Sequence, residues 1–398
     1  WFPDAWQHHG AMAFGAHADH RLRYDHLGIA PDGLRDSDMI ELLDILRREI
    51  RLQGPITLAR YMDLSLNHPH LGYYSKQDPL GRAGDFTTAP EISQMFGELI
   101  GLWACVVWQQ IGRPNAINLV ELGPGRGTLM ADMLRAASIA PSFREAIAVH
   151  LVETSPALRA VQAEALAYYK PKWHDNDTTL PAGPLIIIAN EFFDALPIRQ
   201  FERRASLWHE RLVGLAEDSQ LCFVLSPPQS ANPMVPDSHK NAPEGTIVEI
   251  CLAASNIVTR LANSIGRYGG GALIIDYGHD GRHAGVTFQG VKDHRSHPPL
   301  ARPGDADLTA YVDFGALSIA ANTLYTKTYG PMAQGVFLQK LGIRERAEIL
   351  MKGADGSLRD EICSALARLT DAKEMGTLFK VMAIGESKMP PPPGFESV

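Results

Sequence analysis

A glycine-rich segment with one acidic residue stands out in the first half of the chain. Residues 119–130 read Leu-Val-Glu-Leu-Gly-Pro-Gly-Arg-Gly-Thr-Leu-Met. Glycine allows a positive φ and a close approach of a ligand to the main chain, so the pattern predicts a strand, a ligand-binding turn and a helix. The expected cofactor-binding residues of this turn are Glu121, Gly123, Gly125 and Gly127.

The identity of the ligand is indicated by two residues of this segment. A dinucleotide-binding turn would have glycine where Thr128 stands, and the carboxylate of Glu121 would repel a pyrophosphate. A carboxylate attracts a ligand that carries an ammonium and a sulfonium group. The turn therefore predicts S-adenosylmethionine as the cofactor, and the alternative is a tight turn that binds no ligand.

A second acidic residue ends the next apolar segment. Residues 148–153 read Ala-Val-His-Leu-Val-Glu, and Ser155 with Pro156 is a favourable start for a helix. With a crossover helix over residues 128–137, the two strands would form one β-α-β unit. Glu153 is then expected to bind the ribose hydroxyls of the cofactor, and the alternative is an acid on a solvated loop.

Two further segments are expected to contribute to the same cofactor site. A weaker strand is predicted over residues 169–173, and Asp175 beyond it is placed to reach the adenine amino group. Residues 68–90 are polar and rich in glycine, and loops of this length usually cover an active site. The residues of this loop expected over the cofactor are Gly84, Asp85, Phe86, Thr87 and Thr88.

A continuous apolar segment at residues 184–189 ends in a polar and aromatic cluster. Such a segment is typical of a central parallel strand, and ligands of open α/β sheets bind at the carboxyl ends of the strands. Asn190, Glu191 and Asp194 are therefore expected to face the methyl group of the cofactor. The alternative is a helix N-terminus, where acidic side chains interact favourably with the helix dipole.

Composition narrows the classes of protein and partner. The chain has 398 residues, 45% of them hydrophobic, and a formal net charge of −8. This length accommodates an α/β domain with substantial additions, and the acidic balance argues against a nucleic-acid partner. The four cysteines are far apart in apolar contexts, so neither a disulfide framework nor a metal site is predicted. No apolar segment is long enough for membrane insertion, and no secretion signal is recognised.

The order of these patterns divides the chain into six segments. Helices are predicted over residues 38–52, 57–66 and 92–111, and residues 88–91 match a capping box in which Glu91 would be only a cap. The predicted segments are a poorly ordered, histidine-containing extension (1–36), an N-terminal helical segment that covers the site (37–112), the cofactor-binding core (113–198), an inserted β module (199–250), the remaining α/β core with C-terminal elements (251–388) and a Pro-rich tail (389–398).

Longer strings of the chain resemble the MidA family of S-adenosylmethionine-dependent methyltransferases. The resemblance covers nearly all of residues 37–384, and it rests on residues 67–74, 84–93, 96–98, 121–128, 190–197, 275–279 and 330–338. It implies a Rossmann-like class I methyltransferase sheet with an N-terminal helical segment and an inserted antiparallel module on the substrate side. It also implies a protein client, because the mitochondrial member is an arginine methyltransferase needed for assembly of respiratory complex I.

An arginine acceptor sets a specific chemical demand. Arginine stays protonated in proteins, so bringing it to a sulfonium places two cations together. Two carboxylates can offset this repulsion and orient the guanidinium, and Glu191 and Asp194 are the expected pair. Asp276 or His279, at the end of a strand predicted over residues 271–276, is expected to accept the released proton. The alternative is that both only cap the strand end.

Two other functions stay open at this stage. Asn190 could head a degenerate form of the Asn-Pro-Pro-Tyr loop of amide or adenine methyltransferases, although the prolines are missing. The chain could also be an assembly chaperone that retains a cofactor site, because fold alone does not prove activity. The absence of an Arg- and Ser-rich amphipathic leader favours a bacterial cytoplasm, and the alternative is the mitochondrial matrix.

Overall fold

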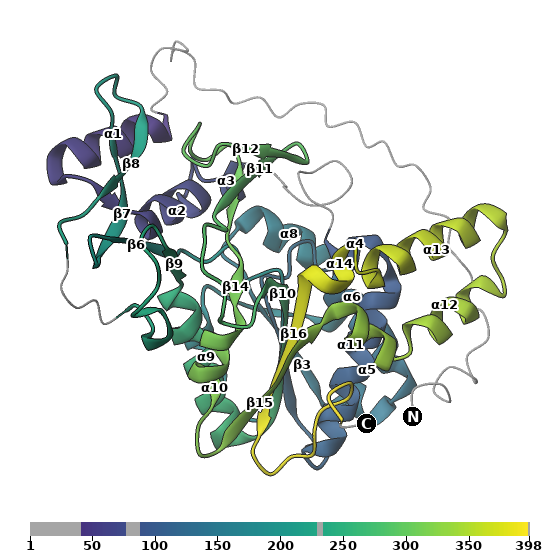
Figure 1. The fold of residues 1–398 in the computed structure, drawn as a ribbon. Coiled ribbons are helices and arrows are strands. Elements are labelled where there is room, and N and C mark those ends of the chain that lie inside the picture. Colours follow the sequence, from purple (N-terminus) through teal and green to yellow (C-terminus); the bar gives the residue numbers. More distant parts are fainter. Residues whose placement is uncertain (1–40, 77–87, 229–233, 397–398) are drawn as a thin grey trace.

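The computed structural model describes residues 41–76, 88–228 and 234–396, and its centre is an eight-stranded sheet (Figure 1). The strands of this sheet are β2 (Ile117–Leu122), β3 (Ile147–Val152), β4 (Lys172–His174), β5 (Leu185–Asn190), β10 (Gly270–His279), β14 (Val312–Asp313), β15 (Thr326–Ala333) and β16 (Phe379–Glu386). Their order is β4, β3, β2, β5, β10, β16 and β15, with β14 beside β10. Strands β2 to β5 and β10 pair in parallel, and β16 is antiparallel to both neighbours.

Helices cover both faces of the sheet, as Figure 1 shows. The longer helices are α5 (Gln94–Gln110), α6 (Thr128–Ala136), α8 (Pro156–Ala165), α9 (Leu252–Tyr268), α10 (Phe314–Ala321), α12 (Ile343–Met351) and α13 (Gly356–Thr370), and the shorter ones are α7 (Pro141–Ala146), α11 (Gln334–Lys340) and α14 (Met375–Leu378). Alternate residues of a strand point to opposite faces. In β5, Ile186 and Ile188 pack in the cluster of α5 and α6, whereas Ile187 and Ala189 pack in that of α9 and α10. The predicted central, fully buried strand is confirmed.

A smaller module stands beside the main sheet, at the upper left of Figure 1. Its strands are β1 (Ile56–Thr57), β6 (Arg199–Arg204), β7 (Leu207–Leu215), β8 (Leu221–Leu225) and β9 (Ile247–Ile250), and its helices are α1 (Leu42–Gln53), α2 (Leu58–Asn67) and α3 (Tyr73–Lys76). The predicted antiparallel strands are confirmed, but β1 from the N-terminal segment joins the same sheet. A separate three-stranded sheet contains β11 (Gln289–Lys292), β12 (Arg295–His297) and β13 (Asp307–Thr309).

Two predicted elements have different boundaries in the structure. The strand predicted at residues 169–173 begins only at Lys172, because Lys170 has a left-handed backbone with φ 48° and Pro171 follows it. The helix predicted over residues 92–111 is interrupted at Ser93, which is extended. A four-residue helix, α4 (Ala89–Ile92), precedes this interruption, and the Ser93 side chain accepts a hydrogen bond from the Met95 amide at 3.2 Å.

The C-terminal residues pack back onto the α/β core. The Phe395 ring lies 5.4 Å from the ring of Phe337 in α11 and 6.3 Å from the ring of Tyr329 in β15. The tail predicted at residues 389–398 is thus part of the packed structure as far as residue 396. The extension predicted at residues 1–36 lies outside the described residues.

Several further observations apply to the described part of the chain. None of its helices combines the length and apolar character required to cross a membrane. Its four cysteines are free thiols. Within the same ranges, no group of three or more His, Cys, Asp or Glu side chains is arranged to hold a metal ion.

Candidate active site

A cavity of about 550 Å³ lies at the carboxyl ends of β2, β3 and β5. This is the edge where open α/β sheets bind ligands. Among the described residues that line it, one is an arginine or lysine, Arg126, and nine are acidic. The acidic lining residues are Asp63, Glu91, Glu121, Glu153, Asp175, Asp177, Glu191, Asp194 and Asp307. The cavity is therefore suited to cationic ligands.

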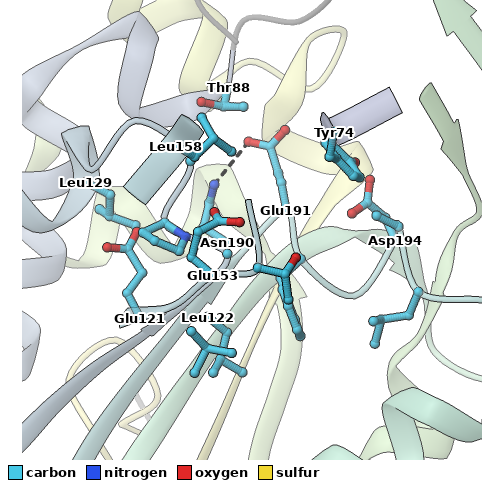
Figure 2. Close-up of a pocket in the computed structure, with 18 of the residues that line it drawn as sticks. Tyr74, Thr88, Glu121, Leu122, Leu129, Glu153, Leu158, Asn190, Glu191 and Asp194 are labelled. Carbon is cyan, nitrogen blue, oxygen red and sulfur yellow. Dashed lines mark hydrogen bonds between the residues drawn. The ribbon is translucent and has the colours of Figure 1, made fainter. Parts of the chain in front are cut away.

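The cavity has two halves, which Figure 2 shows side by side. Glu121 and Leu129 lie on one side, Tyr74 and Asp194 lie on the other, and Asn190 and Glu191 lie between them. After the ligands that the sequence predicts for them, we call the side lined by Glu121, Gly123, Gly125 and Glu153 the cofactor half. The side lined by Tyr74, Glu191, Asp194, Tyr277 and Asp307 is called the acceptor half in the same way.

The glycine turn has the backbone conformation that its sequence predicts. Gly123, Gly125 and Gly127 have φ values of 63°, 54° and 82°, a region that other residues rarely adopt. A Cβ atom on Gly123 would lie 2.9 Å from a ring carbon of Phe192. Gly123 and Gly125 line the cavity, whereas Gly127 is the N-cap of α6 and does not.

Glu121 is a buried carboxyl group at the end of β2. The residue is 2% exposed, and its Oε2 atom has no hydrogen-bond partner among the described residues. Burial raises the pKa of Glu121 to about 8. A buried, unpartnered polar atom is costly, so an unpartnered oxygen at a cavity wall indicates a ligand that pairs with it.

Glu153 is held at the end of β3 by two hydrogen bonds. Its Oε1 accepts from the Ser155 amide at 2.8 Å, and its Oε2 accepts from the Gln162 side chain at 3.3 Å. Burial raises the pKa of Glu153. Gln162 also donates to the Gly125 carbonyl at 2.7 Å, so it ties the turn to Glu153. Sequence reasoning missed Gln162, because one glutamine within a helix carries no distinguishing pattern.

Of the other residues predicted to bind the cofactor, some line the cavity and some lie outside the described residues. Asp175 lines the cavity, but its side chain is 79% exposed and pairs with Arg159 at 2.6 Å. Thr88 lines the cavity as well. The predictions for Gly84, Asp85, Phe86 and Thr87 lie outside the described residues.

The acceptor half contains a loop with a strained backbone. Glu191 has φ 50°, which is unfavourable for a residue with a side chain. Its amide donates to the Ile275 carbonyl at 3.0 Å, and its Oε1 accepts from the amide of Ala89 and the side chain of Asn190, both at 3.1 Å. Residues 191–194 are not helical. The alternative of a helix N-terminus at this site is therefore wrong.

Asn190 and Asp194, which lie near Glu191 in the sequence, each have one buried oxygen that pairs with no residue in the described part of the chain. Asn190 Oδ1 and Asp194 Oδ1 are buried and have no hydrogen-bond partner among the described residues. Asp194 Oδ2 accepts a hydrogen bond from the Tyr277 hydroxyl. Burial raises the pKa of Asp194 to about 6, and burial together with the charge of Asp194 raises the pKa of Glu191 to about 7.

The predicted proton acceptors at the end of β10 are corrected by the structure. Asp276 is fully buried, and it accepts hydrogen bonds from the amides of Phe193, Asp194 and Tyr277 at 3.0 to 3.3 Å. Asp276 therefore anchors the acidic loop and does not line the cavity. His279 does not line it either, because β10 continues past the cavity and pairs there with β14, where His279 Nδ1 lies 4.0 Å from Asp313.

Three acceptor-half residues were not predicted from the sequence. The Tyr277 hydroxyl reaches Asp194, and the Tyr74 hydroxyl donates to Asp307 at 2.9 Å. Burial raises the pKa of both tyrosines well above the ordinary value, so both hydroxyls remain donors. Tyr277 directly follows a predicted strand end, which was an available signal. Asp307 comes from the three-stranded sheet, which no sequence pattern had indicated.

The capping box predicted at residues 88–91 is not formed. Thr88 precedes α4 but its side chain makes no capping hydrogen bond. Glu91 Oε1 instead accepts a hydrogen bond from the Thr128 hydroxyl at 2.5 Å, and both residues line the cavity. Glu91 thus connects α4 with the start of α6.

These features define the class of the protein. A mostly parallel sheet with an antiparallel β16, a glycine turn after β2 and acidic residues at the ends of β2 and β3 are the parts of a class I S-adenosylmethionine-dependent methyltransferase. The site fits that cofactor, because Gly123 and Gly125 leave the backbone accessible and Glu121 offers a buried oxygen that no described residue pairs with. The comparisons with known proteins agree with this assignment.

Residues 99–332 match the model of a family described as S-adenosyl-L-methionine-dependent methyltransferases. A Danio rerio protein named "Protein arginine methyltransferase NDUFAF7, mitochondrial" is 39% identical over 370 residues, which are 86% of each chain. The Homo sapiens protein of that name is 37% identical over 376 residues, covering 88% of this chain and 84% of the relative. The chain therefore belongs to the MidA family of S-adenosylmethionine-dependent methyltransferases.

Solved structures give the same assignment. A COG1565 superfamily protein from Burkholderia thailandensis, crystallised with S-adenosyl-homocysteine, is 27% identical with a TM-score of 0.74. The match covers 90% of this chain and 93% of that one. A native structure of a COG1565 superfamily protein from the same organism is 28% identical with a TM-score of 0.71, and it covers 90% and 92% of the two chains. The protein is thus an S-adenosylmethionine-dependent methyltransferase.

Proposed function

We propose that this methyltransferase methylates an arginine of a protein client. The observation that carries the proposal is the acidic lining of the cavity. Among its described lining residues, nine are acidic and one, Arg126, is an arginine or lysine. Methyl transfer from a sulfonium to a guanidinium brings two cations into one site. An acidic cavity offsets their repulsion, and it would not assist a neutral acceptor in the same way.

Glu191 and Asp194 are the proposed ligands of the guanidinium. Asp194 has one oxygen held by Tyr277 and the other, Oδ1, without a partner among the described residues, so it can accept from a guanidinium N–H. Glu191 is fixed by the Ala89 amide through Oε1. Two carboxylates set on one short loop can hold a planar, multidentate cation in a defined orientation.

Glu191 also accounts for the proton that is released. The bound cofactor supplies an electrophilic methyl group on a sulfonium, and a new N–CH3 bond forms as the S–CH3 bond breaks. The methylated nitrogen must then lose one proton. A carboxyl group whose pKa burial has raised to about 7 is matched to proton transfer near neutral pH, so we assign the proton to Glu191.

The proposals for the client and for its compartment rest on the similarity to known relatives. The resemblance to the MidA family supports a subunit of respiratory complex I as the client. The curated relatives at 37% to 39% identity are named mitochondrial, which supports the mitochondrial matrix over the bacterial cytoplasm. Incubating single complex I subunits with the enzyme and methyl-labelled cofactor tests the client, and label on an arginine of one subunit is the expected result.

Amide variants of the two acids test the proposed chemistry. Glu191→Gln and Asp194→Asn should each lower methyl transfer to the client at least about a hundredfold, because the transition-state charge loses a carboxylate. Affinity for S-adenosylhomocysteine, measured by calorimetry, should change less than about twofold.

Two matched control variants lie on the surface of the smaller module. Glu244 and Asp218 each accept one backbone amide hydrogen bond, from Ala205 at 2.7 Å and Gln220 at 3.0 Å, and neither lines the cavity. Glu244→Gln and Asp218→Asn should retain wild-type transfer. Wild-type transfer in both active-site variants would overturn the arginine mechanism, and label on a side-chain amide would favour an amide methyltransferase instead.

A further inference from the structure

The short helix α4 contacts both halves of the cavity. Thr88, Pro90 and Glu91 line the cavity, and Ala89 is fully buried in the hydrophobic cluster of α5 and α6. The helix has only four residues and begins without a side-chain capping bond, so few local hydrogen bonds fix its position. Its placement therefore depends on the contacts that it makes with other elements.

One of these contacts is with the cofactor half. Glu91 Oε1 accepts from the Thr128 hydroxyl at 2.5 Å, and Thr128 is the first residue of α6, directly after the glycine turn. Both side chains line the cavity. We therefore expect a ligand that fills the cofactor half to lie beside both partners of this hydrogen bond.

The other contact is with the acceptor half. The Ala89 amide donates to Glu191 Oε1 at 3.1 Å. Glu191 has the strained φ of 50°, and such conformations persist only where neighbouring groups hold them. The position of α4 is thus one of the features that fix the Glu191 carboxylate.

From these two contacts we infer that α4 links cofactor binding to acceptor binding, with Glu91 as a positioning residue. Occupation of the cofactor half stabilises the Glu91–Thr128 contact, which holds α4 in place, and α4 in turn holds Glu191 toward the acceptor. By linkage, the acceptor strengthens cofactor binding by the same factor. This inference rests on the proposed function in naming an arginine as the acceptor.

A binding experiment measures the link directly. The affinity for S-adenosylhomocysteine is measured by calorimetry with and without a saturating arginine-containing client peptide. In the wild type the peptide should raise the affinity for S-adenosylhomocysteine about tenfold, which is within the usual range of coupling between sites. In Glu91→Leu, which has no acceptor, and in Thr128→Val this factor should fall to about one, whereas Thr128→Ser, which keeps the hydroxyl, should retain most of it.

A double variant tests whether both residues act through the same contact, and a remote variant serves as a control. Because both single changes remove the same contact, Glu91→Leu with Thr128→Val should lose no more coupling than either alone. Thr259→Val removes an exposed helix hydroxyl that donates to the Ser255 carbonyl, and it should keep the wild-type factor. Wild-type coupling in both single variants would overturn the role of α4.

A second measurement needs no acceptor. It therefore tests the role of α4 even if the arginine proposal fails. Hydrogen exchange of the Ala89 amide reports its bond to Glu191. S-adenosylhomocysteine should slow this exchange at least about tenfold in the wild type and much less in Thr128→Val. Equal slowing in both proteins would contradict the inference, whereas a wild type that shows the slowing but methylates no arginine would contradict only the proposed function.

Discussion

At the scale of residues, individual buried carboxyl groups determine the electrostatic properties of this site. Glu121, Glu191 and Asp194 all have a raised pKa, and burial is the main cause for each. Burial without a cation is unfavourable for the charged form of a carboxyl group. These residues therefore cost stability in the free protein and become favourable when a cationic ligand is bound.

Glu121→Gln tests this trade between stability and binding. A carboxyl group with a folded-state pKa near 8 contributes stability that is complete below its unfolded pKa of about 4.3 and is lost as the pH rises toward about 8. The cofactor-free variant should therefore be more stable than the wild type at pH 8, by at least about 1 kcal/mol, with a smaller difference at pH 5. Denaturant unfolding at both pH values measures this.

The same variant should bind S-adenosylmethionine at least about tenfold more weakly, because an amide cannot offset the charge of the ligand. Calorimetry at pH 8 gives the affinity. Equal stability and equal affinity in variant and wild type would show that Glu121 neither carries a charge there nor contacts the cofactor.

The pH dependence of methyl transfer reports Glu191. The ratio kcat/KM reflects groups of the free enzyme, so it should rise with pH through about 7 as Glu191 loses its proton. Asp194 raises the pKa of Glu191 by charge repulsion. Asp194→Asn should therefore move this inflection to lower pH while lowering the overall rate. An inflection that stays in place in this variant would assign the titration to another group.

At the scale of elements, the turn between β2 and α6 is the part that most directly forms the cofactor half. Gly125 lines the cavity and has φ 54°, which a β-branched residue scarcely tolerates. Gly125→Val should weaken S-adenosylmethionine at least about a hundredfold in calorimetry while the protein stays folded by circular dichroism.

Gly245 provides a matched control for that substitution. It also has a left-handed backbone, with φ 79°, but a Cβ atom there would meet nothing within 4 Å and the residue does not line the cavity. Gly245→Val should carry a similar backbone strain and retain cofactor affinity. Full affinity in Gly125→Val would remove the turn from the cofactor site.

Elements with strong local signals could be predicted from the sequence, and those fixed by distant contacts could not. The apolar β5 and the turn at Gly123 follow from local residue types and spacing. The break of the helix at Ser93 and the late start of β4 at Lys172 escaped prediction. The predicted capping box failed because Glu91 finds a partner in Thr128, 37 residues away in the chain.

At the scale of the whole molecule, the acceptor half is assembled from three parts of the chain. Tyr74 comes from the N-terminal helical segment, Asp194 follows a core strand, and Asp307 comes from the three-stranded sheet. Sequence reasoning placed Glu191 and Asp194 at the end of a recognisable strand, and both line the cavity there. It missed Tyr74 and Asp307, because their approach depends on how the added elements pack against the core.

The central claim is that this acidic cavity receives an arginine. A guanidinium can share two carboxylates as a planar fork, whereas a lysine ammonium is a single point charge and must also lose its proton before it attacks. The most direct measurement is mass spectrometry of two client peptides, identical except for Arg or Lys at the acceptor position, after incubation with the enzyme and S-adenosylmethionine. Methylation of the arginine peptide with at least about a hundredfold less on the lysine peptide is the predicted result, and equal methylation of both would contradict the account.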